Sequence, residues 1–386
     1  MSAVSASVHS VPAPDPIRVM VVDDSVVARG LMARWIADEP DLEIVASLRT
    51  GRQAVDWLAQ GDADVAVLDV DMPELDGLSA LPLLLARKPD LVVIMASTLT
   101  RRNAEIGLKA LSLGAADCIA KPEAGRGAAA AAAFRRELVE KIRHIGLRRG
   151  RLRRTRARVM PGRGRPGSER MPGPRPISIR DHESRAPVVL RPAVARPPRV
   201  LLIGASTGGP HALMSLLPQL GGVADRVPIL VVQHMPPTFT TILAEHIQRA
   251  SGRPAREGVD GEAIVSGTIY VAPGGRHMRV AMRGGRPIIR LDDGPPINFC
   301  KPAVDPLFES ACAAWGARAL AIILTGMGSD GTRGARAIAA AGGTVIAQDE
   351  ATSVVWGMPG SAVQAGGCSA VLPLGQIAPE IARAFS

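Results

Sequence analysis

The residues best suited to chemistry follow three apolar runs in the second half of the chain. Ser206 lies in the glycine-framed turn Gly204-Ala-Ser206-Thr-Gly208, directly after the first of these runs. A serine on a sharp strand-to-helix turn presents its hydroxyl to a substrate carbonyl, and the flanking glycines let the backbone come close. The same pattern by itself also fits an ordinary turn in an α/β protein.

A histidine and an aspartate follow the other two runs. His234 comes directly after Pro228–Gln233, and Asp330 comes shortly after Ala319–Thr325. Because the carboxyl ends of parallel strands meet at one edge of a sheet, we expect both side chains near the serine. His234 would accept the serine proton, and Asp330 would fix the imidazole tautomer. The glycines around Met327 would leave backbone N–H groups to face an oxyanion.

Each of these residues also has a plainer interpretation. A histidine at the end of a strand can be structural, and an aspartate in Ser-Asp-Gly is a common turn former. The combination of three residues at three strand ends favours a catalytic site over these alternatives.

Five polar residues follow apolar runs in the first half of the chain: Asp23, Asp24, Asp69, Ser97 and Lys121. Clustered carboxylates repel one another unless a hard cation binds, so the three aspartates are candidate Mg²⁺ ligands. Asp69 is the candidate nucleophile for an aspartyl phosphate. Lys121 would pair with the added charge, and Ser97 would hydrogen-bond the new oxygens. Each acid taken alone could be a turn or a cap.

The apolar runs alternate with helical patterns and predict two domains in the 386 residues. The fold class is α/β, with two doubly wound parallel-sheet domains over residues 17–146 and 199–386. Residues 1–16 are predicted to be a disordered tail, and residues 147–198 a disordered linker.

The charge is concentrated in that linker. Sixteen arginines and three acidic residues lie between positions 147 and 199, a net charge of +13, whereas the rest has 30 basic and 33 acidic residues. The segment is also rich in proline and glycine, a composition that cannot bury enough apolar surface to fold. It is either a solvated spacer or a segment attracted to an anionic partner, and both interpretations stay open.

The four cysteines lack the spacing of a metal site or of a C-x-x-C pair, which indicates free thiols in a reducing compartment. The first sixteen residues lack a basic and an apolar signal region, and no uncharged apolar run reaches the roughly 18 residues of a membrane span. We therefore expect a cytoplasmic protein without membrane insertion.

The first half resembles the response-regulator receiver domain in four segments: Val21–Ser25, Leu68–Gly77, Ala96–Thr98 and Lys121–Pro122. This resemblance implies a flavodoxin-like fold. It also implies Mg²⁺-dependent phosphorylation of Asp69 by the histidine kinase of a chemosensory system.

The second half resembles the catalytic domain of CheB, the chemotaxis protein-glutamate methylesterase, in five segments: Ile203–Gly209, Gln233–Met235, Tyr270–His277, Thr325–Gly331 and Ala347–Pro359. The family's order of serine, histidine and aspartate maps onto Ser206, His234 and Asp330, and its oxyanion contact onto the backbone of Met327. The resemblance implies a Rossmann-like domain that hydrolyses glutamate γ-methyl esters on methyl-accepting chemoreceptors and releases methanol, without a cofactor. Glutamine deamidation is implied as a second activity, and phosphorylation as the event that uncovers the site.

The sequence departs from the family pattern at three places. Cys118 stands where receivers usually carry an aromatic residue, and Asn298–Asp305 lacks the histidine and serine often found around its proline. The arginine-rich linker is also longer than usual. Aromatic-based signalling, substrate contacts and the position of the receiver over the site are therefore expected to differ.

Two other functions fit parts of the sequence. A receiver-controlled binding protein could grip nucleic acid or acidic lipid through Arg148–Arg199, but no DNA-binding motif accompanies the arginines. A dinucleotide site at Gly204–Gly209 fails because Ser206 replaces the middle glycine and no ribose-binding acid follows the next strand. We expect a phosphorylation-activated esterase with no specific nucleic-acid partner, and we expect His211 and His277 to be structural.

Overall fold

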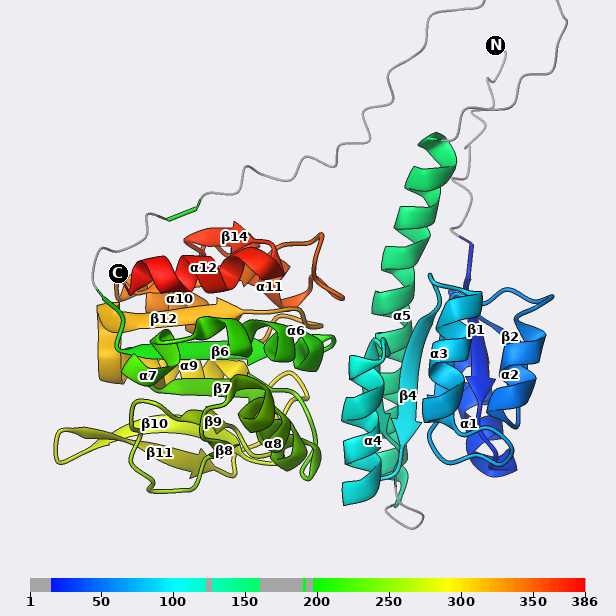
Figure 1. Ribbon diagram of the computed structural model, residues 1–386, viewed down its shortest axis with the longest axis horizontal. Coiled ribbons are helices and arrows are strands. Elements are labelled where there is room, and N and C mark those ends of the chain that lie inside the picture. Colours follow the sequence, from blue (N-terminus) through cyan, green and yellow to red (C-terminus); the bar gives the residue numbers. More distant parts are fainter. Residues whose placement is uncertain (1–14, 123–126, 160–189, 192–196, 386) are drawn as a thin grey trace, which may run out of the picture.

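Two parallel β-sheets organise the chain (Figure 1). The computed structural model describes residues 15–122, 127–159, 190–191 and 197–385, and for residues 147–159 it describes the backbone alone. The expected fold class, two parallel-sheet α/β domains, is confirmed.

The first domain is a five-stranded sheet in the order β2-β1-β3-β4-β5, with every pair parallel. Its strands are β1 (Ile17–Val22), β2 (Leu42–Leu48), β3 (Val65–Asp69), β4 (Val92–Ser97) and β5 (Asp117–Ala120). Its helices are α1 (Val26–Ala37), α2 (Gly51–Trp57), α3 (Gly77–Arg87), α4 (Arg101–Ser112) and α5 (Gly127–Val159).

The starts of these helices are fixed by side-chain caps. Ser25, Thr50, Asp76 and Thr100 each accept a hydrogen bond from a backbone N–H in the first turn of α1, α2, α3 and α4. Such caps satisfy donors that a helix leaves unpaired. The central strands β3 and β4 are buried at every residue, whereas the edge strand β2 is partly exposed.

The second domain is a seven-stranded parallel sheet in the order β14-β13-β12-β6-β7-β9-β8, with a separate antiparallel hairpin of β10 and β11. Its strands are β6 (Val200–Ala205), β7 (Ile229–Gln233), β8 (Ala255–Glu257), β9 (Ile269–Val271), β10 (His277–Arg283), β11 (Arg286–Asp292), β12 (Ala319–Ile323), β13 (Thr344–Gln348) and β14 (Ala370–Leu372). Its α-helices are α6 (Gly209–Leu216), α7 (Val223–Arg226), α8 (Phe239–Ser251), α9 (Val304–Trp315), α10 (Thr332–Ala340), α11 (Met358–Gln364) and α12 (Leu374–Ala384), and its 3₁₀ helices are η1 (Leu217–Leu220) and η2 (Gly316–Arg318).

The strand order decides where chemistry can occur in this sheet. Strand β6 is the first in the sequence and lies between β12 and β7, so the chain runs outward from it in both directions. Ligands of open α/β sheets bind at the carboxyl ends of the strands at such a switch point. Ser206, His234 and Asp330 follow β6, β7 and β12 and therefore share this edge.

The segment between the two sheets differs in part from the sequence expectation. The backbone of α5 remains helical to Val159, so the helix includes the first thirteen residues of the predicted linker. Most of the linker and of the predicted N-terminal tail lie outside the described residues, including residues 1–14, 160–189 and 192–196. In the described part of the chain, no helix is both long enough and apolar enough to span a membrane.

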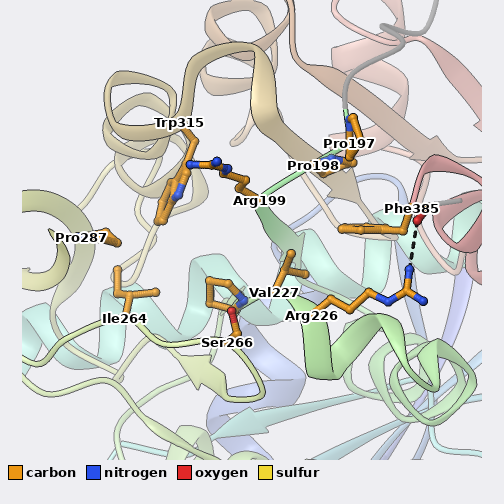
Figure 2. Close-up of a pocket in the computed structure, with 11 residues that line it drawn as sticks. Pro197, Pro198, Arg199, Arg226, Val227, Ile264, Ser266, Pro287, Trp315 and Phe385 are labelled. Atoms are coloured by element: carbon orange, nitrogen blue, oxygen red, sulfur yellow. Dashed lines mark hydrogen bonds between the residues drawn. The ribbon is translucent and has the colours of Figure 1, made fainter. Parts of the chain in front are cut away.

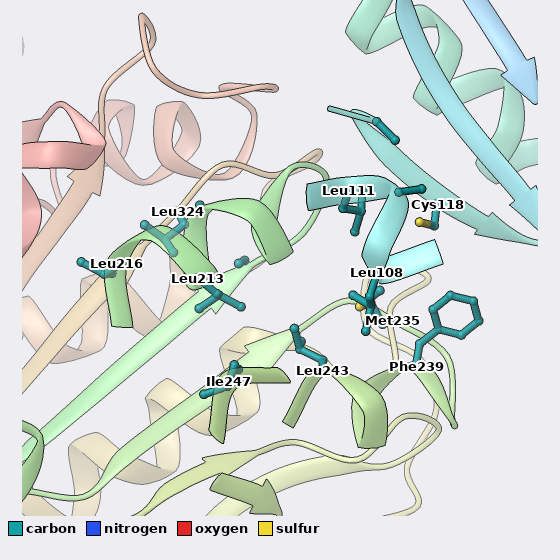
Figure 3. Close-up of a cluster of buried hydrophobic side chains, with 14 of the residues drawn as sticks. Leu108, Leu111, Cys118, Leu213, Leu216, Met235, Phe239, Leu243, Ile247 and Leu324 are labelled. Atoms are coloured by element: carbon teal, nitrogen blue, oxygen red, sulfur yellow. The ribbon is translucent and has the colours of Figure 1, made fainter. Parts of the chain in front are cut away.

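The two domains meet through α4, which packs against α8 and α6 (Figure 1). Leu108 and Leu111 of α4 belong to one buried cluster with Leu213 and Phe239 of the second domain (Figure 3). At the rim of this contact, Arg101 donates to both carboxylate oxygens of Glu245 at 2.8 and 2.9 Å. The carboxyl edge of the second sheet faces the first domain (Figure 1).

A pocket of about 450 Å³ lies at the opposite edge of the second sheet (Figure 2). Arg199 and Pro228 line it, and they directly precede β6 and β7. Because the candidate catalytic residues follow the strands, this pocket lies away from them.

The packing of the first domain can be tested by substituting two adjacent leucines of α3 that differ in burial. Leu84 is fully buried and Leu83 is 41% exposed. Leu84→Ala should lower the free energy of unfolding by about 2–5 kcal/mol, because it removes transfer energy and leaves a cavity. Leu83→Ala should change it by less than about 0.5 kcal/mol. Urea denaturation followed by circular dichroism measures both; equal losses would contradict the packing described here.

Candidate active site

The serine turn, which follows β6, is held by contacts from the end of β7 and from the loop after β12. The N–H of Ser206 donates to the carbonyl of Thr325 at 3.0 Å, and Nε2 of Gln233 donates to the carbonyl of Ser206 at 2.9 Å. A Cβ on Gly326 would lie 2.8 Å from Cβ of Ser206, so the loop after β12 approaches the serine only because residue 326 has no side chain. Gly208 has φ of 76°, which lets the chain turn directly into α6.

His234 and Asp330 form a hydrogen-bonded pair, with 2.8 Å between Nε2 and Oδ2. Asp330 also accepts backbone N–H groups from Val304 at 2.6 Å, Asp305 at 3.0 Å and Gly331 at 2.9 Å. Burial favours the neutral carboxyl, but His234 and these N–H groups outweigh it and lower the pKa of Asp330. The aspartate therefore stays charged and orients the imidazole.

The imidazole of His234 is strongly biased toward its protonated form. Burial lowers its pKa, but interactions with Cys300 and Asp330 outweigh burial and raise the pKa to about 10. Its Nδ1 is buried and has no hydrogen-bond partner among the described residues, so the hydrogen bond between Nδ1 and the Ser206 hydroxyl is not formed. Such catalytic hydrogen bonds often form only when substrate binds.

The loop after β12 offers a donor for an oxyanion. Gly326 is fixed on both sides, because its N–H donates to Val355 and its carbonyl accepts from Met358. The N–H of Met327 donates to no described residue. It is therefore available to a negatively charged oxygen beside Ser206.

Two glutamines at the carboxyl edge of the second sheet hydrogen-bond the backbone around the site. The sequence did not identify them as site residues. Gln233 holds the carbonyl of Ser206, and Oε1 of Gln348 accepts the N–H of Thr325 at 2.8 Å. Their position could have identified them, because Gln233 is the last residue of β7 and Gln348 is the last residue of β13. His277 is structural as expected, since it is 1% exposed and both of its ring nitrogens contact backbone groups, of Pro295 and Ala303.

The carboxylates of the first domain also come together. Side-chain oxygens of Asp23, Asp24 and Asp69 lie within 4.8 Å of one another. Nζ of Lys121 lies 2.7 Å from Oδ2 of Asp23 and 2.6 Å from Oδ1 of Asp69. Oγ of Ser97 is buried without a partner among the described residues.

This cluster fits a divalent cation and a phosphoryl group. Burial raises the pKa of Asp69 to about 6, because the neighbouring charge of Asp23 adds to burial and the ammonium of Lys121 offsets both only in part. A cation among the three carboxylates would relieve their repulsion. The unpartnered hydroxyl of Ser97 is the kind of buried polar group that an added oxygen would satisfy.

Fold and site together define a response regulator in which a receiver domain is joined to an α/β domain with a serine, histidine and aspartate at its switch point. Family models match residues 19–132, as the response regulator receiver domain, and residues 201–381, as CheB methylesterase.

Relatives match this chain over nearly its whole length. The chain is 61% identical to a protein-glutamate methylesterase/protein-glutamine glutaminase of group 2 operon from Rhodopseudomonas palustris, over 96% of this chain and 95% of that protein. It is 61% identical to a protein of the same enzyme name from Nitrobacter hamburgensis, with the same coverage. Among solved structures, the CheB methylesterase catalytic domain of Thermotoga maritima is 40% identical with a TM-score of 0.47, covering 48% of this chain and 98% of that one. The chain belongs to the CheB family of protein-glutamate methylesterases/protein-glutamine glutaminases.

The protonation of His234 can be followed by NMR in the full chain. We expect its titration midpoint near pH 10, well above the ordinary value of 6.5. Since the folded pKa is raised, the stability that this proton contributes is complete below pH 6.5 and is lost as the pH rises toward 10. Asp330→Asn should move the midpoint downward.

His246 is an internal control for this titration, because burial and the nearby Arg249 lower its pKa. A midpoint for His234 at or below that of His246 would contradict the electrostatics of the site.

Proposed function

We propose that this chain is a phosphorylation-activated serine esterase that hydrolyses glutamate γ-methyl esters on chemoreceptors to glutamate and methanol. The observation that carries the proposal is the buried pair of His234 and Asp330 at the same sheet edge as the Ser206 turn. Ser206, His234 and Asp330 are the proposed catalytic residues, and the Met327 N–H is the proposed oxyanion donor.

The reaction follows from these roles. Oγ of Ser206 attacks the ester carbonyl while His234 in its deprotonated form accepts the proton through Nδ1, because Nε2 faces Asp330. The raised pKa of His234 makes this form the minor one at neutral pH and the stronger base. The tetrahedral oxyanion is stabilised by the N–H of Met327. His234 returns the proton to the departing methanol, and water then hydrolyses the acyl-enzyme by the same steps. No cofactor is needed for this chemistry.

The same steps can deamidate a receptor glutamine, because a primary amide has the same carbonyl geometry and His234 can protonate the departing ammonia. Both reactions end in a glutamate. Deamidation is therefore proposed as a second activity of the same site.

Regulation is assigned to the receiver. Asp23, Asp24 and Asp69 would hold Mg²⁺, which neutralises the charge of an incoming phosphoryl group when bound. Asp69 accepts the phosphoryl group, while Lys121 pairs with its charge and Ser97 donates its hydroxyl to it. These last contacts transmit the change to the end of β4.

The domain contact supports control by occlusion. Val355 belongs to the same buried cluster as receiver side chains, and Met327 packs against that cluster. The guanidinium of Arg136, on α5, lies 4.3 Å from the ring centroid of Phe299 in the loop before α9. The receiver thus covers the loop that carries the oxyanion donor, and phosphorylation would release it.

The partners and location follow from this assignment. The substrates are methyl-accepting chemoreceptors, and the phosphoryl donor is the histidine kinase of the same chemosensory system. We propose a cytoplasmic enzyme that works on the cytoplasmic part of its receptors, with no specific nucleic-acid partner and no membrane insertion.

The first test uses methyl-esterified chemoreceptor membranes, with methanol release as the readout, with and without a small phosphodonor and Mg²⁺. The wild-type rate should rise with phosphodonor, and Ser206→Ala should lose about 10⁴-fold or more in turnover. For Asp69→Ala the ratio of stimulated to unstimulated rate should fall to one. Normal turnover by Ser206→Ala would show that another residue is the nucleophile.

The domain contact is tested by charge reversal. Both side chains of the Arg101–Glu245 pair are about half exposed, so solvent screens the attraction and the pair contributes little to the contact. Arg101→Glu should raise the unphosphorylated rate modestly, by a few-fold at most, because it replaces a screened attraction across the contact with a screened repulsion. The double variant Arg101→Glu/Glu245→Arg should return the rate to the wild-type value. No response to either change would argue against occlusion through this interface.

A further inference from the structure

A pocket lined by three arginines lies on the second domain, and no proposed catalytic residue lines it. Its volume is about 420 Å³. The arginines are Arg191, Arg333 and Arg336, and the other lining residues are alanines and one glycine of α10 and of the turn after α11. Because cations are the only charged groups of this lining, the pocket attracts anions.

Arg191 is held in place by the backbone around the pocket. Its N–H donates to the carbonyl of Cys368 at 3.1 Å, and its guanidinium donates to the carbonyl of Ala339 at 2.9 Å. These bonds fasten the described end of the arginine-rich segment to α10 and to the loop after α11. A guanidinium has several N–H donors, so others remain available to a ligand.

Arg333 and Arg336 differ in the partners they already have. They are three residues apart on α10 and therefore lie on the same side of the helix. Nε of Arg333 lies 3.1 Å from Oδ2 of Asp305 and 3.6 Å from Oε1 of Glu309. Arg336 is exposed and pairs with no acidic side chain of the described residues. It is therefore the arginine most available to a carboxylate from outside the chain.

The pocket lies close to the candidate active site. Gly331, the residue before α10, donates its N–H to Asp330. Asp305, the partner of Arg333, donates its own N–H to the same carboxylate at 3.0 Å. Arg333 is thus separated from a proposed catalytic side chain by one residue, and Arg336 follows one helical turn further on. A protein segment that extends beyond the active site along α10 reaches this pocket.

We propose that the arginine pocket docks a carboxylate-bearing segment of the receptor, next to the glutamate ester that is hydrolysed. The proposal rests on the proposed function and deepens it by naming how the substrate protein is recognised. Each hydrolysis turns a neutral ester into a glutamate, so a receptor segment with several such positions carries carboxylates beside its remaining esters. Arginine binds a carboxylate through two parallel N–H···O bonds, which position the docked segment as well as attract it.

The pocket would act on substrate binding and not on the chemical step, because no proposed catalytic residue lines it. Exposed ion pairs each contribute modestly and are weakened by salt. The signature of docking is therefore a KM for receptor that rises when a charge is lost or when salt is added, without a matching fall in kcat.

The test measures methanol release from methyl-esterified receptor membranes by the full-length protein, with phosphodonor and Mg²⁺ present. Arg336→Glu should raise KM about fivefold and leave kcat within about twofold, because it replaces a screened attraction with a screened repulsion. Added salt should raise the KM of wild type and affect that of Arg336→Glu much less. Arg336→Lys should lie between the two, because lysine keeps the charge but loses the two-point contact.

Arg283→Glu is the matched control. Arg283 is the last residue of β10, is exposed, pairs with no acidic side chain of the described residues and does not line the pocket. The substitution changes the net charge equally and should leave KM at the wild-type value. Equal shifts in KM for Arg283→Glu and Arg336→Glu would overturn the proposal, as would an unchanged KM or a loss of kcat alone for Arg336→Glu.

Co-sedimentation separates docking from hydrolysis and from lipid binding. In a Ser206→Ala background, which lacks the proposed nucleophile, Arg336→Glu should weaken binding to receptor membranes but not to receptor-free membranes of the same lipid composition. An equal loss on both would assign the pocket to an anionic lipid and overturn the proposal. If wild type releases no methanol while binding to receptor membranes still depends on Arg336, the proposed function fails and the docking pocket stands.

Discussion

The charge of Asp330 is the constraint on which the rest of the second domain depends. A buried carboxylate is costly unless it is paired, and here it accepts the N–H groups of Val304, Asp305 and Gly331 as well as facing His234. Val304 and Asp305 start α9, whose N-terminus favours negative charge. The carboxylate therefore fastens the loop after β12 to α9 and orients the imidazole in one arrangement.

The same arrangement links catalysis to regulation. The chain that enters α9 carries Phe299, whose ring lies against the guanidinium of the receiver's Arg136, and also Val304, whose N–H donates to Asp330. On the other side of the site, Met327 packs against a cluster that includes receiver side chains. A movement of the receiver would therefore change the packing of Met327, the oxyanion donor, and of the loop near His234 directly.

Two of the buried aspartates, Asp330 and Asp69, differ in a way that suits their proposed roles. Asp330 has a pKa lowered by His234 and backbone donors despite burial, so it remains an anion throughout the reaction. Asp69 has a pKa raised to about 6, because burial and the charge of Asp23 outweigh the single ammonium of Lys121. The negative charge of Asp330 is balanced by groups of the protein itself. The negative charge around Asp69 is balanced only when a cation binds there.

The sequence alone determined the two α/β domains and the strand ends where Ser206, His234, Asp330 and the receiver carboxylates stand, because apolar runs and the residues that follow them are local patterns. The tertiary structure decided what no local pattern contains. Residues 147–159 continue α5 as a helix, although their composition is typical of a linker. Gln233 and Gln348 gained their roles from contacts between segments distant in sequence. The α4 contact between the domains likewise depends on surfaces that exist only once both sheets have formed.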